Sequence, residues 1–600
     1  MKPEIIKKIE EVWDSRILLS PAPDRPNLHV GLMAYKEHNP KFALNAFGQI
    51  VGLNVCNMGL NDDQWLKIKT ILEAEKVELE ALNASGNRIR TFIAPKRLQK
   101  LQFLEVDDNP IENLPEEILS DGNAAILNFI RQIDEQEGTI PLYEAKLLIV
   151  GQPGAGKTTL LEKLNDPSYI VPKEDGDPNI ESTIGVNIYE GWSFPMGDGS
   201  SQLFKANLWD FGGQEIQYMT HHFFLTPRAL YVLMADDRKQ NTEFDYWFRI
   251  INLLGKEKED EQINVLVVLN EINHRSVTNF DLAKYRKSYP GMNIQMREVD
   301  FSVKDRRSDS IAHEIQALLK ELPHIGDELP KLWVPIREEL LEIRKEKPHI
   351  SFFEFAAVCK KDRNGKKLER EDDQRFLSQY LHRLGVMLHY QEDDDLDNFV
   401  ILKPQWAVDS VYSVLQDTAV VKNKGRFTKD DLKKCWKKFS SNERSRLLSL
   451  MSKDHFEICY PTSNPGEYIA PQLLPTKMPA FDWDRTQTMK LRYQYPFMPK
   501  GLISRLIVRL STDIAENGSL VWKEGVVIEQ SGCRALVEQN KTIKEGLEVL
   551  EIEVDGEQYE RKFLLRHIMD KIEAIHHKSF KNISFDRMVP CICDQCKTSA

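Results

Sequence analysis

Membrane-spanning segments are the first feature that this 600-residue sequence lacks. Its apolar runs, such as Val265–Leu269, have the length of a strand, whereas a membrane helix needs about 20 apolar residues. The N-terminal stretch MKPEIIKKIEEVW is charged throughout and has no signal-peptide core. We therefore expect no membrane span and a cytoplasmic protein.

Cysteine and net positive charge are also scarce. Eight cysteines in the chain are too few for a disulfide scaffold, which is typical of a reducing compartment. The chain has 80 Lys and Arg against 92 Asp and Glu, a net charge of −12, which argues against a nucleic-acid partner. Glycine and proline are neither abundant nor periodic, which excludes a fibrous protein. The length predicts about four domains.

A repeat is the first positive signal. The pattern L-x-x-L-x-A-x-x-N-x-I at 79–89 recurs at 101–111 with Val in place of Ala, and a weaker copy with Met58 at the Asn position occupies 50–60. We expect short leucine-rich repeats over 46–120, because each unit must stack on its neighbours to bury its apolar face. Their concave face would bind protein partners; a cap that only packs against the next domain is the alternative. Residues 1–45 carry no motif, and 121–140 predict a linker helix.

The octapeptide GQPGAGKT (151–158) is a phosphate-binding motif in the required context. A strand-like run, AKLLIV, precedes it and a helix-compatible segment follows. Backbone N–H groups would wrap the phosphates, Lys157 would neutralise the β/γ oxygens, and the Thr158 hydroxyl would bind Mg²⁺. The predicted phosphate-binding residues are Gly151, Gly154, Ala155, Gly156, Lys157, Thr158 and Thr159.

Two further segments complete this predicted site. Asp210 ends a strand and would hold Mg²⁺ through water, the Gly213 N–H would contact the γ-phosphate, and Gln214 would orient the attacking water. A switch residue that contacts a partner subunit is the alternative for Gln214. Thr183 precedes Ile-Gly and a strand, and would close over Mg²⁺ and the γ-phosphate. Lys157, Thr183 and Gln214 are the candidate catalytic residues, and Thr158, Thr183 and Asp210 the candidate Mg²⁺ ligands.

This run of motifs resembles the Ras-like small GTPases. Strand-like segments at 229–236, 264–270 and 293–300 alternate with helix-compatible ones, which predicts a mostly parallel sheet with helices on both faces. The resemblance implies that the nucleotide base is recognised by an N-K-x-D motif. Here the sequence is Asn270-Glu271-Ile272-Asn273.

This departure bears on base specificity. An Asn at position 273 presents an NH₂ where the family's Asp accepts a second hydrogen bond from guanine, and a lost bond of this kind costs about 1–3 kcal/mol. Weakened guanine selectivity and a tolerated family variant are both open. Ser302-Val303-Lys304 resembles the last GTPase element, in which a backbone N–H contacts guanine O6, and this favours guanine.

Three phrases after the GTPase motifs, LKPQW (402–406), FEICY (456–460) and YIAPQLLP (468–475), are similar to those of the Roco family. That family joins a Roc (Ras of complex) GTPase to a COR (C-terminal of Roc) domain; no kinase signature follows here. The resemblance implies an α/β multidomain protein: Roc over 141–325, a winged-helix-like first half of COR over 326–478, and a sheet-plus-helix second half over 479–600. It also implies a homodimer formed through COR.

The periodicity of residues 326–600 predicts individual helices and strands. Segments at 330–346 and 372–388 predict helices, with a short strand at 396–402. The stretch 490–555 predicts strands, including LISRLIVRLST (502–512), and 563–578 predicts an amphipathic helix.

Three cysteines crowd the C-terminus. Cys591, Cys593 and Cys596 have the spacing of Zn²⁺ ligands, but a structural zinc site takes four ligands and no fourth follows in the chain. Free thiols are the alternative. His576 and His577 are candidates for the fourth ligand.

Together these features predict a Roco-type protein that binds GTP and Mg²⁺ and hydrolyses GTP to GDP and phosphate. Hydrolysis would be slow because no stabilising arginine can be assigned, although Arg228 and Arg238 follow the second switch. The Roco resemblance implies that nucleotide state is coupled to COR-mediated dimerisation and to the binding of protein partners. A nucleotide-binding scaffold with negligible hydrolysis and an ATP-dependent oligomerising switch are the rival functions.

Overall fold

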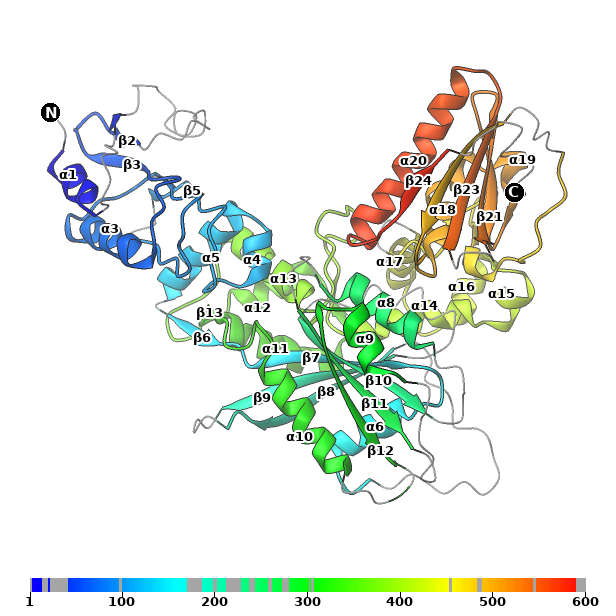
Figure 1. Ribbon diagram of the computed structural model, residues 1–600, viewed down its shortest axis with the longest axis horizontal. Coiled ribbons are helices and arrows are strands. Elements are labelled where there is room, and N and C mark those ends of the chain that lie inside the picture. The colour runs from blue at the N-terminus through cyan, green and yellow to red at the C-terminus, as the bar shows by residue number, and fades with distance from the viewer. Residues whose placement is uncertain are drawn as a thin grey trace. The chain divides into compact units, whose positions relative to one another are not determined.

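The protein, described by a computed structural model, divides into two compact units (Figure 1). The first comprises residues 1–143 and 324–404, and the second comprises 144–323 and 405–600. The chain therefore passes from the first unit to the second at residue 144, returns to the first at residue 324, and enters the second again at residue 405. The structure describes residues 3–12, 20–21, 41–95, 100–136, 138–169, 186–197, 202–211, 228–236, 243–256, 262–271, 280–301, 303, 307–452, 456–482, 488–542 and 547–589.

The first unit combines a strand-and-loop segment with a group of helices. Its elements are α1 (Glu4–Glu10), β1 (Ser20–Pro21), β2 (Lys41–Leu44), β3 (Ile50–Asn54), α3 (Asp62–Ala74), β4 (Ala81–Asn83), β5 (Phe103–Glu105), α4 (Glu116–Ser120), α5 (Asn123–Gln136), β6 (Thr139–Pro141), β13 (Glu328–Pro330), α11 (Trp333–Glu346), β14 (His349–Ile350), α12 (Phe352–Cys359), α13 (Glu371–Arg383) and β15 (Val400–Ile401).

The repeated sequence pattern stacks in parallel. Strands β3, β4 and β5 pair in parallel register, with Leu82 opposite Leu104. Asn87 fixes the turn after β4: its Oδ1 accepts from the backbone N–H of Met58 and Leu60, at 3.0 Å each, and its Nδ2 donates to backbone carbonyls. Asn109, 22 residues later, makes the same type of bond to Ala84 O and Val106 O. The repeated asparagines therefore satisfy the backbone where each unit turns off its strand.

Helix α5, which the sequence predicts as a linker, is packed into the core of the first unit. Phe129 meets Trp333 of α11 edge to face at 5.5 Å. The Trp333 indole N–H donates to Gln132 Oε1 at 2.7 Å, and both side chains are buried. Buried residues of the repeats, α5 and the helices after residue 330 form one continuous core.

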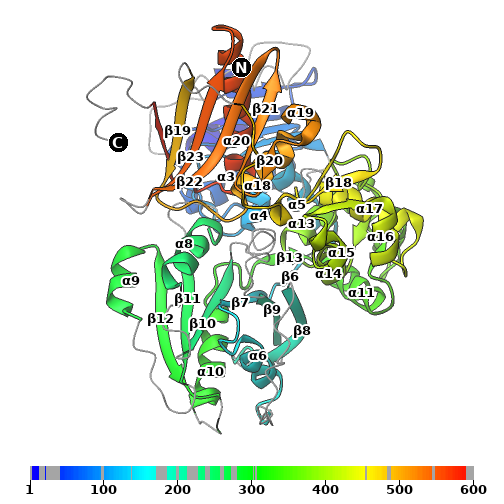
Figure 2. The same ribbon diagram turned by 90° about the vertical axis from the view of Figure 1, so that its right-hand side faces the viewer.

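The second unit begins with a six-stranded sheet in the order β12-β11-β10-β7-β9-β8 (Figure 2). All neighbouring described strands are parallel except the edge strand β8, which is antiparallel to β9. The strands predicted at 229–236, 264–270 and 293–300 correspond to β10, β11 and β12. The elements are β7 (Glu144–Gly151), α6 (Lys157–Asn165), β8 (Val186–Pro195), β9 (Leu203–Phe211), β10 (Ala229–Asp236), α8 (Phe244–Leu254), β11 (Ile263–Asn270), α9 (Leu282–Ser288), β12 (Met292–Val299) and α10 (Arg307–Lys320).

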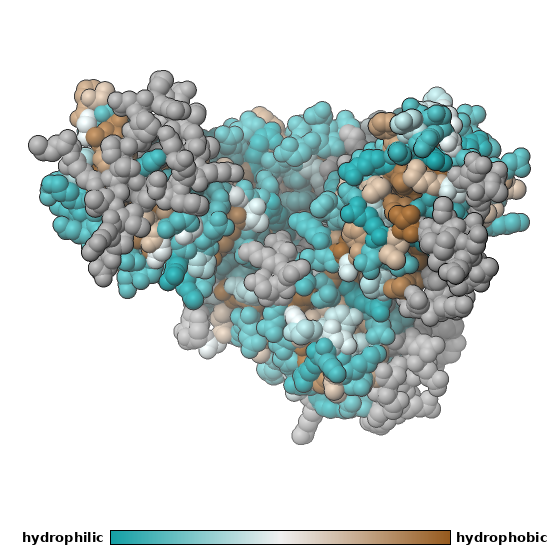
Figure 3. Space-filling model, turned by 45° about the horizontal axis from the view of Figure 1, so that its top comes forward, coloured by the Kyte–Doolittle hydropathy of each residue, from teal (hydrophilic) through white to brown (hydrophobic). Residues whose placement is uncertain are grey.

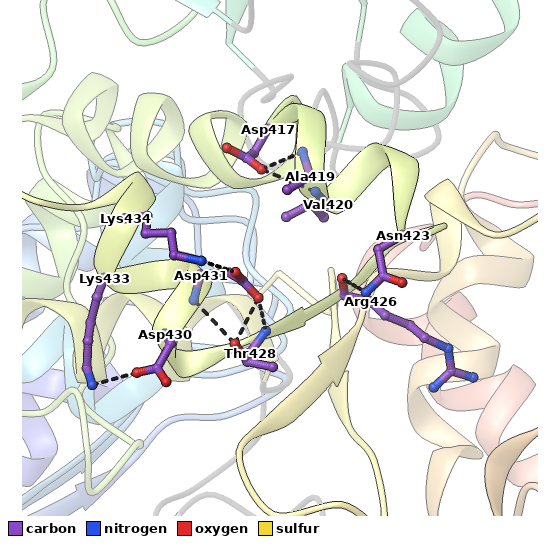
Figure 4. A network of polar contacts seen from close by, with 10 residues as sticks. All are labelled: Asp417, Ala419, Val420, Asn423, Arg426, Thr428, Asp430, Asp431, Lys433 and Lys434. Carbon is purple, nitrogen blue, oxygen red and sulfur yellow. Dashed lines mark hydrogen bonds and ion pairs between the residues drawn. The ribbon is translucent and has the colours of Figure 1, made fainter.

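A helical segment with a small sheet follows residue 404. Two of its helices have well-formed N-caps: Asp417 accepts from the N–H of Ala419 and Val420, and Thr428 with Asp431 forms a capping box (Figure 4). The elements are α14 (Pro404–Leu415), α15 (Thr418–Lys422), β16 (Arg426–Thr428), α16 (Lys429–Cys435), α17 (Ser441–Ser452), β17 (Tyr460–Pro461), β18 (Glu467–Ile469) and the 3₁₀ turn η4 (Pro471–Leu473).

The C-terminal part is a six-stranded antiparallel sheet, in the order β20-β21-β22-β23-β19-β24, with a long helix packed along it (Figure 1). Its elements are β19 (Met489–Tyr495), α18 (Leu502–Arg509), the 3₁₀ turn η5 (Ser511–Asp513), α19 (Ala515–Gly518), β20 (Val521–Trp522), β21 (Gly525–Gln530), β22 (Cys533–Thr542), β23 (Leu547–Asp555), α20 (Glu560–Ser579) and β24 (Asp586–Met588).

The strand predicted at 502–512 is wrong, because Leu502–Arg509 is helix α18. Its apolar residues recur at intervals of three and four, and Leu502, Leu506 and Leu510 are all fully buried. Gly501, in the left-handed region at φ +97°, starts the helix. β-branched residues in this segment favour a strand, and tertiary burial of the helix on nearly all sides, from Leu502 to Val508, outweighed that preference.

None of the helices in the described ranges has the length and apolar character needed to cross a membrane. Hydrophilic residues predominate among the coloured residues of the face in Figure 3, with smaller groups of hydrophobic ones between them. Tyr559 and Phe563, one turn apart at the start of α20, are 69% and 70% exposed.

Candidate functional site

The glycine-rich loop between β7 and α6 has the backbone shape of a phosphate cradle. Gly151, Gly154 and Gly156 lie in the left-handed region, at φ +136°, +82° and +95°. A Cβ on Gly151 would lie 2.2 Å from Met234 O, and one on Gly156 would lie 2.6 Å from Asn270 Nδ2. Only glycine fits these two positions, and the loop leads directly into the N-terminus of α6.

Lys157 and Thr158 start helix α6 at this loop. The Lys157 side chain is buried, and its Nζ donates to the carbonyl oxygens of Gly151 at 3.0 Å and Gln152 at 2.9 Å. The ammonium group is therefore held inside the curve of the loop. A compact charge in this position suits the β/γ-phosphate oxygens of a nucleotide.

Thr158 and Asp210 come together from different elements. The Thr158 hydroxyl donates to Asp210 Oδ2 at 2.8 Å, and Asp210, near the end of β9, is completely buried. A hydroxyl beside a carboxylate at the mouth of a phosphate loop is a donor set that fits Mg²⁺, which binds oxygen ligands. Tyr189 lies nearby, and burial, with smaller effects of the Glu162 and Asp210 charges, raises its pKa.

Asn270, at the end of β11, ties three segments together. Its Nδ2 donates to Ala155 O at 3.3 Å, and its Oδ1 accepts from the Phe301 N–H at 3.2 Å. The phosphate loop and the segment after β12 are thus fixed relative to each other. This is the carboxyl edge of a parallel sheet, where α/β proteins bind ligands.

The Glu271 carboxylate is almost buried and forms an ion pair with Arg307, at the start of α10, with Nη1 2.8 Å from Oε2. Sequence reasoning missed Arg307. The available signal was Glu271 itself, since a carboxylate that folding nearly buries costs free energy unless a cation pairs with it.

Several predicted site residues lie outside the described residues. They are Thr183, Gly213, Gln214, Asn273, Ser302, Lys304, Arg238 and the three cysteines 591, 593 and 596. Val303 is described and is 41% exposed. Thr159 is in α6, one residue beyond the Thr158–Asp210 contact. His576 is buried, and its Nε2 lies 3.1 Å from the Tyr495 hydroxyl. Within the described part of the chain, no group of three His, Cys, Asp or Glu side chains is placed to hold a metal ion.

Sequence reasoning also missed the contacts of helix α8 with the C-terminal part of the second unit. Arg249 Nη1 donates to Pro496 O at 2.6 Å, and its guanidinium lies 5.8 Å from the Phe497 ring centroid. Tyr246 meets Phe497 at 5.7 Å and lies under the Lys500 ammonium. No local pattern could reveal these contacts, because the partners are about 250 residues apart.

Three family models match the chain. Residues 146–273 match "Ras of Complex, Roc, domain of DAPkinase", residues 330–474 match "C-terminal of Roc, COR-A domain", and residues 486–600 match "C-terminal of Roc, COR-B domain". Their order along the chain is Roc, COR-A, COR-B.

Curated relatives with the same type of sequence are larger proteins. The chain is 26% identical over 505 residues to a Roc-COR-CHAT protease of an unknown prokaryotic organism, an alignment that covers 77% of this chain and 44% of that protein. It is 26% identical over 529 residues to the probable serine/threonine-protein kinase pats1 of Dictyostelium discoideum, with 82% and 16% covered. The chain thus spans less than half the length of these relatives.

Among solved structures, the chain is similar to Methanosarcina barkeri Roco2 RocCORdC bound to GDP. The identity is 28% and the TM-score 0.45, and the match covers 56% of this chain and 98% of that chain.

Proposed function

Because the chain carries a Roc domain followed by COR-A and COR-B domains and so belongs to the Roco family, we propose that it binds GTP and GDP with Mg²⁺ and hydrolyses GTP. The observation that carries the proposal is the 2.8 Å contact of Thr158 with Asp210 beside the buried Lys157. These groups come from β7–α6 and β9, and their donor atoms suit a metal-bound triphosphate.

The residues of this loop have separate roles in the proposed reaction. Bound Mg²⁺ would supply charge neutralisation on the β- and γ-phosphates, with Thr158 and Asp210 holding it. Lys157 would neutralise the same oxygens from inside the loop, and the backbone N–H groups at 154–159 would orient the phosphates. From the family resemblance, Thr183 and Gly213 would contact the metal and the γ-phosphate, and Gln214 would orient the attacking water.

Guanine is the proposed base. The geometry of Asn270, which joins Ala155 to Phe301, supports a base pocket at the end of β11. Asn273 would accept one guanine hydrogen bond where the family's Asp accepts two, so we propose weaker discrimination between guanine and xanthine than in the family pattern. Competition of GTP with XTP and ATP for the protein tests this, and a strong preference for GTP would contradict it.

The COR region is the proposed dimerisation surface. The exposed Tyr559 and Phe563, on one face of α20, support this because large apolar side chains grouped on a surface favour association. The contacts of Arg249, Tyr246 and Lys500 give α8 of the GTPase domain a direct connection to the COR-B part. Nucleotide state would therefore influence the dimer.

Two further sites are proposed. The stacked parallel strands and the asparagine bonds at Asn87 and Asn109 support leucine-rich repeats, which would bind protein partners. The terminal cysteines Cys591, Cys593 and Cys596 have the spacing of Zn²⁺ ligands but no assigned fourth ligand, so free thiols are the alternative; metal analysis of purified protein, with and without Cys593→Ser, decides between the two.

Single-turnover phosphate release tests hydrolysis. Wild-type protein loaded with GTP should release phosphate slowly, Gln214→Ala more slowly, and Lys157→Ala should not bind GTP. If the wild type binds GTP but releases no phosphate, the protein is a nucleotide-dependent scaffold. Binding of ATP in preference to GTP would instead favour an ATP-dependent switch.

A further inference from the structure

Strand β8 is the outer strand of the described GTPase sheet, and one of its backbone groups is bonded by a residue from the COR region. Edge strands present backbone N–H groups that have no strand partner on the outer side. The Ile188 N–H donates to the side-chain Oε1 of Gln405 at 3.1 Å, although the two residues are 217 positions apart. A side-chain amide from α14 thus takes the place of a neighbouring strand.

The Gln405 amide is held in this orientation. Its Nε2 donates to Asp409 Oδ1 at 2.5 Å, one helical turn later. Helix α14 is in turn anchored by Trp436, whose indole N–H donates to Ser410 O at 2.9 Å and to Ser413 Oγ at 3.1 Å. Because its amide nitrogen is already bonded, Gln405 presents a fixed oxygen to β8.

Ile188, whose N–H bonds Gln405, is one residue away from the position opposite Asp210, the proposed Mg²⁺ ligand on β9. In the antiparallel pair of β8 and β9, Ile188 lies opposite Trp209 and Asn187 lies opposite Asp210. A displacement of β8 at Ile188 would therefore be transmitted through the ladder to the strand that positions Asp210 against Thr158.

We propose that Gln405 is a positioning residue for the nucleotide site: its hydrogen bond to Ile188 holds β8, and through β9 it holds Asp210, so that the COR region slows release of the bound nucleotide. The inference rests on the proposed function, since it requires a nucleotide at the Gly151–Thr158 loop. It assigns to the LKPQW phrase a role that its sequence alone did not indicate.

The test measures the dissociation rate of a fluorescent GDP analogue from the full-length chain, chased with excess GDP in the presence of Mg²⁺. Gln405→Ala removes the bond, and loss of one neutral hydrogen bond predicts release about 2- to 10-fold faster. The double variant Gln405→Glu with Asp409→Asn keeps an acceptor for Ile188 and a donor at position 409, and should restore the wild-type rate. Ser413→Ala removes the hydroxyl bonds of Ser413 but leaves the Trp436 bond to the backbone oxygen of Ser410, and with it the anchor of α14, in place, so it should leave the rate unchanged.

An unchanged rate in Gln405→Ala would overturn the inference. So would an equal acceleration in Ser413→Ala, or a failure of the exchanged pair to restore the rate, because either result would mean general loosening of α14. Wild-type protein that binds no GDP would refute the proposed function itself, which is a separate result. Thermal unfolding of each variant accompanies the kinetics, so that loss of fold is distinguished from faster release.

Discussion

Glu457 and Arg505 form an ion pair in the interior of the second unit, with side chains only 1% and 3% exposed. Arg509 bonds the other oxygen of the same carboxylate. Glu457 belongs to the FEICY segment and both arginines to α18, so the group joins the helical segment after residue 404 to the C-terminal sheet. Burial lowers the pKa of Arg505 to about 10, and the nearby Glu457 opposes that shift, so Arg505 stays charged at neutral pH.

We expect Glu457→Gln to destabilise the protein by about 3–5 kcal/mol, because two buried or half-buried guanidinium groups would lose their counter-charge. Urea denaturation at pH 7.5 measures the loss. Lys433→Ala is the matched control: it breaks the exposed Lys433–Asp430 pair of Figure 4 and should leave the urea midpoint unchanged. A similar midpoint for both variants would contradict a structural role for the buried pair.

His576 should make stability depend on pH. Burial lowers the pKa of His576 to about 4, from an ordinary value of 6.5, so the folded protein holds it neutral while the unfolded chain protonates it. The free energy of unfolding that the neutral His576 contributes is fully present above pH 6.5, and it is lost as pH falls from about 6.5 to about 4.

The measurement is the urea midpoint at pH 7.5 and at pH 5. The difference between the two should shrink in His576→Phe, which keeps an aromatic ring beside Tyr495 and Phe585 but cannot titrate. Substitution of an exposed histidine away from this site, His313→Gln on α10, should leave the difference as in wild type. If His576→Phe keeps the full pH dependence, the buried histidine is not its source.

Gly156→Ala should impair nucleotide binding. The left-handed backbone there costs an alanine about 1–2 kcal/mol, and its Cβ would meet Asn270 Nδ2 at 2.6 Å. We expect GDP affinity to fall at least about 10-fold, measured by isothermal titration with Mg²⁺. Gly326→Ala, in the first unit, is the control: it has a similar φ of +93° but no atom within 4 Å of its Cβ, so it carries the backbone strain without the collision. Equal losses of GDP affinity in the two variants would mean that backbone strain, and not the collision with Asn270 in the phosphate loop, lowers the affinity.

Phe563→Glu should disrupt the proposed dimer. A charge on the exposed face of α20 would have to be desolvated for a second copy to pack there. The molecular mass of both proteins is measured by light scattering with GDP and with a non-hydrolysable GTP analogue. In whichever nucleotide state the wild type is a dimer, the variant should have half the wild-type mass. Phe47→Glu, at a phenylalanine of the first unit that is 89% exposed, should keep the wild-type mass. A dimer that survives Phe563→Glu would place the interface elsewhere.

Much of the nucleotide domain was predictable because its signals are local. Strands β10 and β11 lie where continuous apolar runs predicted them, and β12 lies where the alternation of strand-like and helix-compatible segments predicted it. The phosphate loop is defined by glycines whose backbone angles exclude other residues. Helix α18 was mispredicted because β-branched residues and helical spacing gave opposite signals over the same segment. The role of α5 was not visible, since its partner Trp333 lies about 200 residues further along the chain.

The sequence by itself determined the order of the parts, Roc, COR-A and COR-B, and the chemical groups of the phosphate loop, because both are carried by short motifs read along the chain. Only the tertiary structure decided which distant groups complete them: Asp210 against Thr158, Arg307 against Glu271, Gln405 on Ile188, and Glu457 with Arg505. The physical reason is that a hydrogen bond or ion pair depends on distance in space, and folding sets that distance for residues that the sequence separates by tens or hundreds of positions.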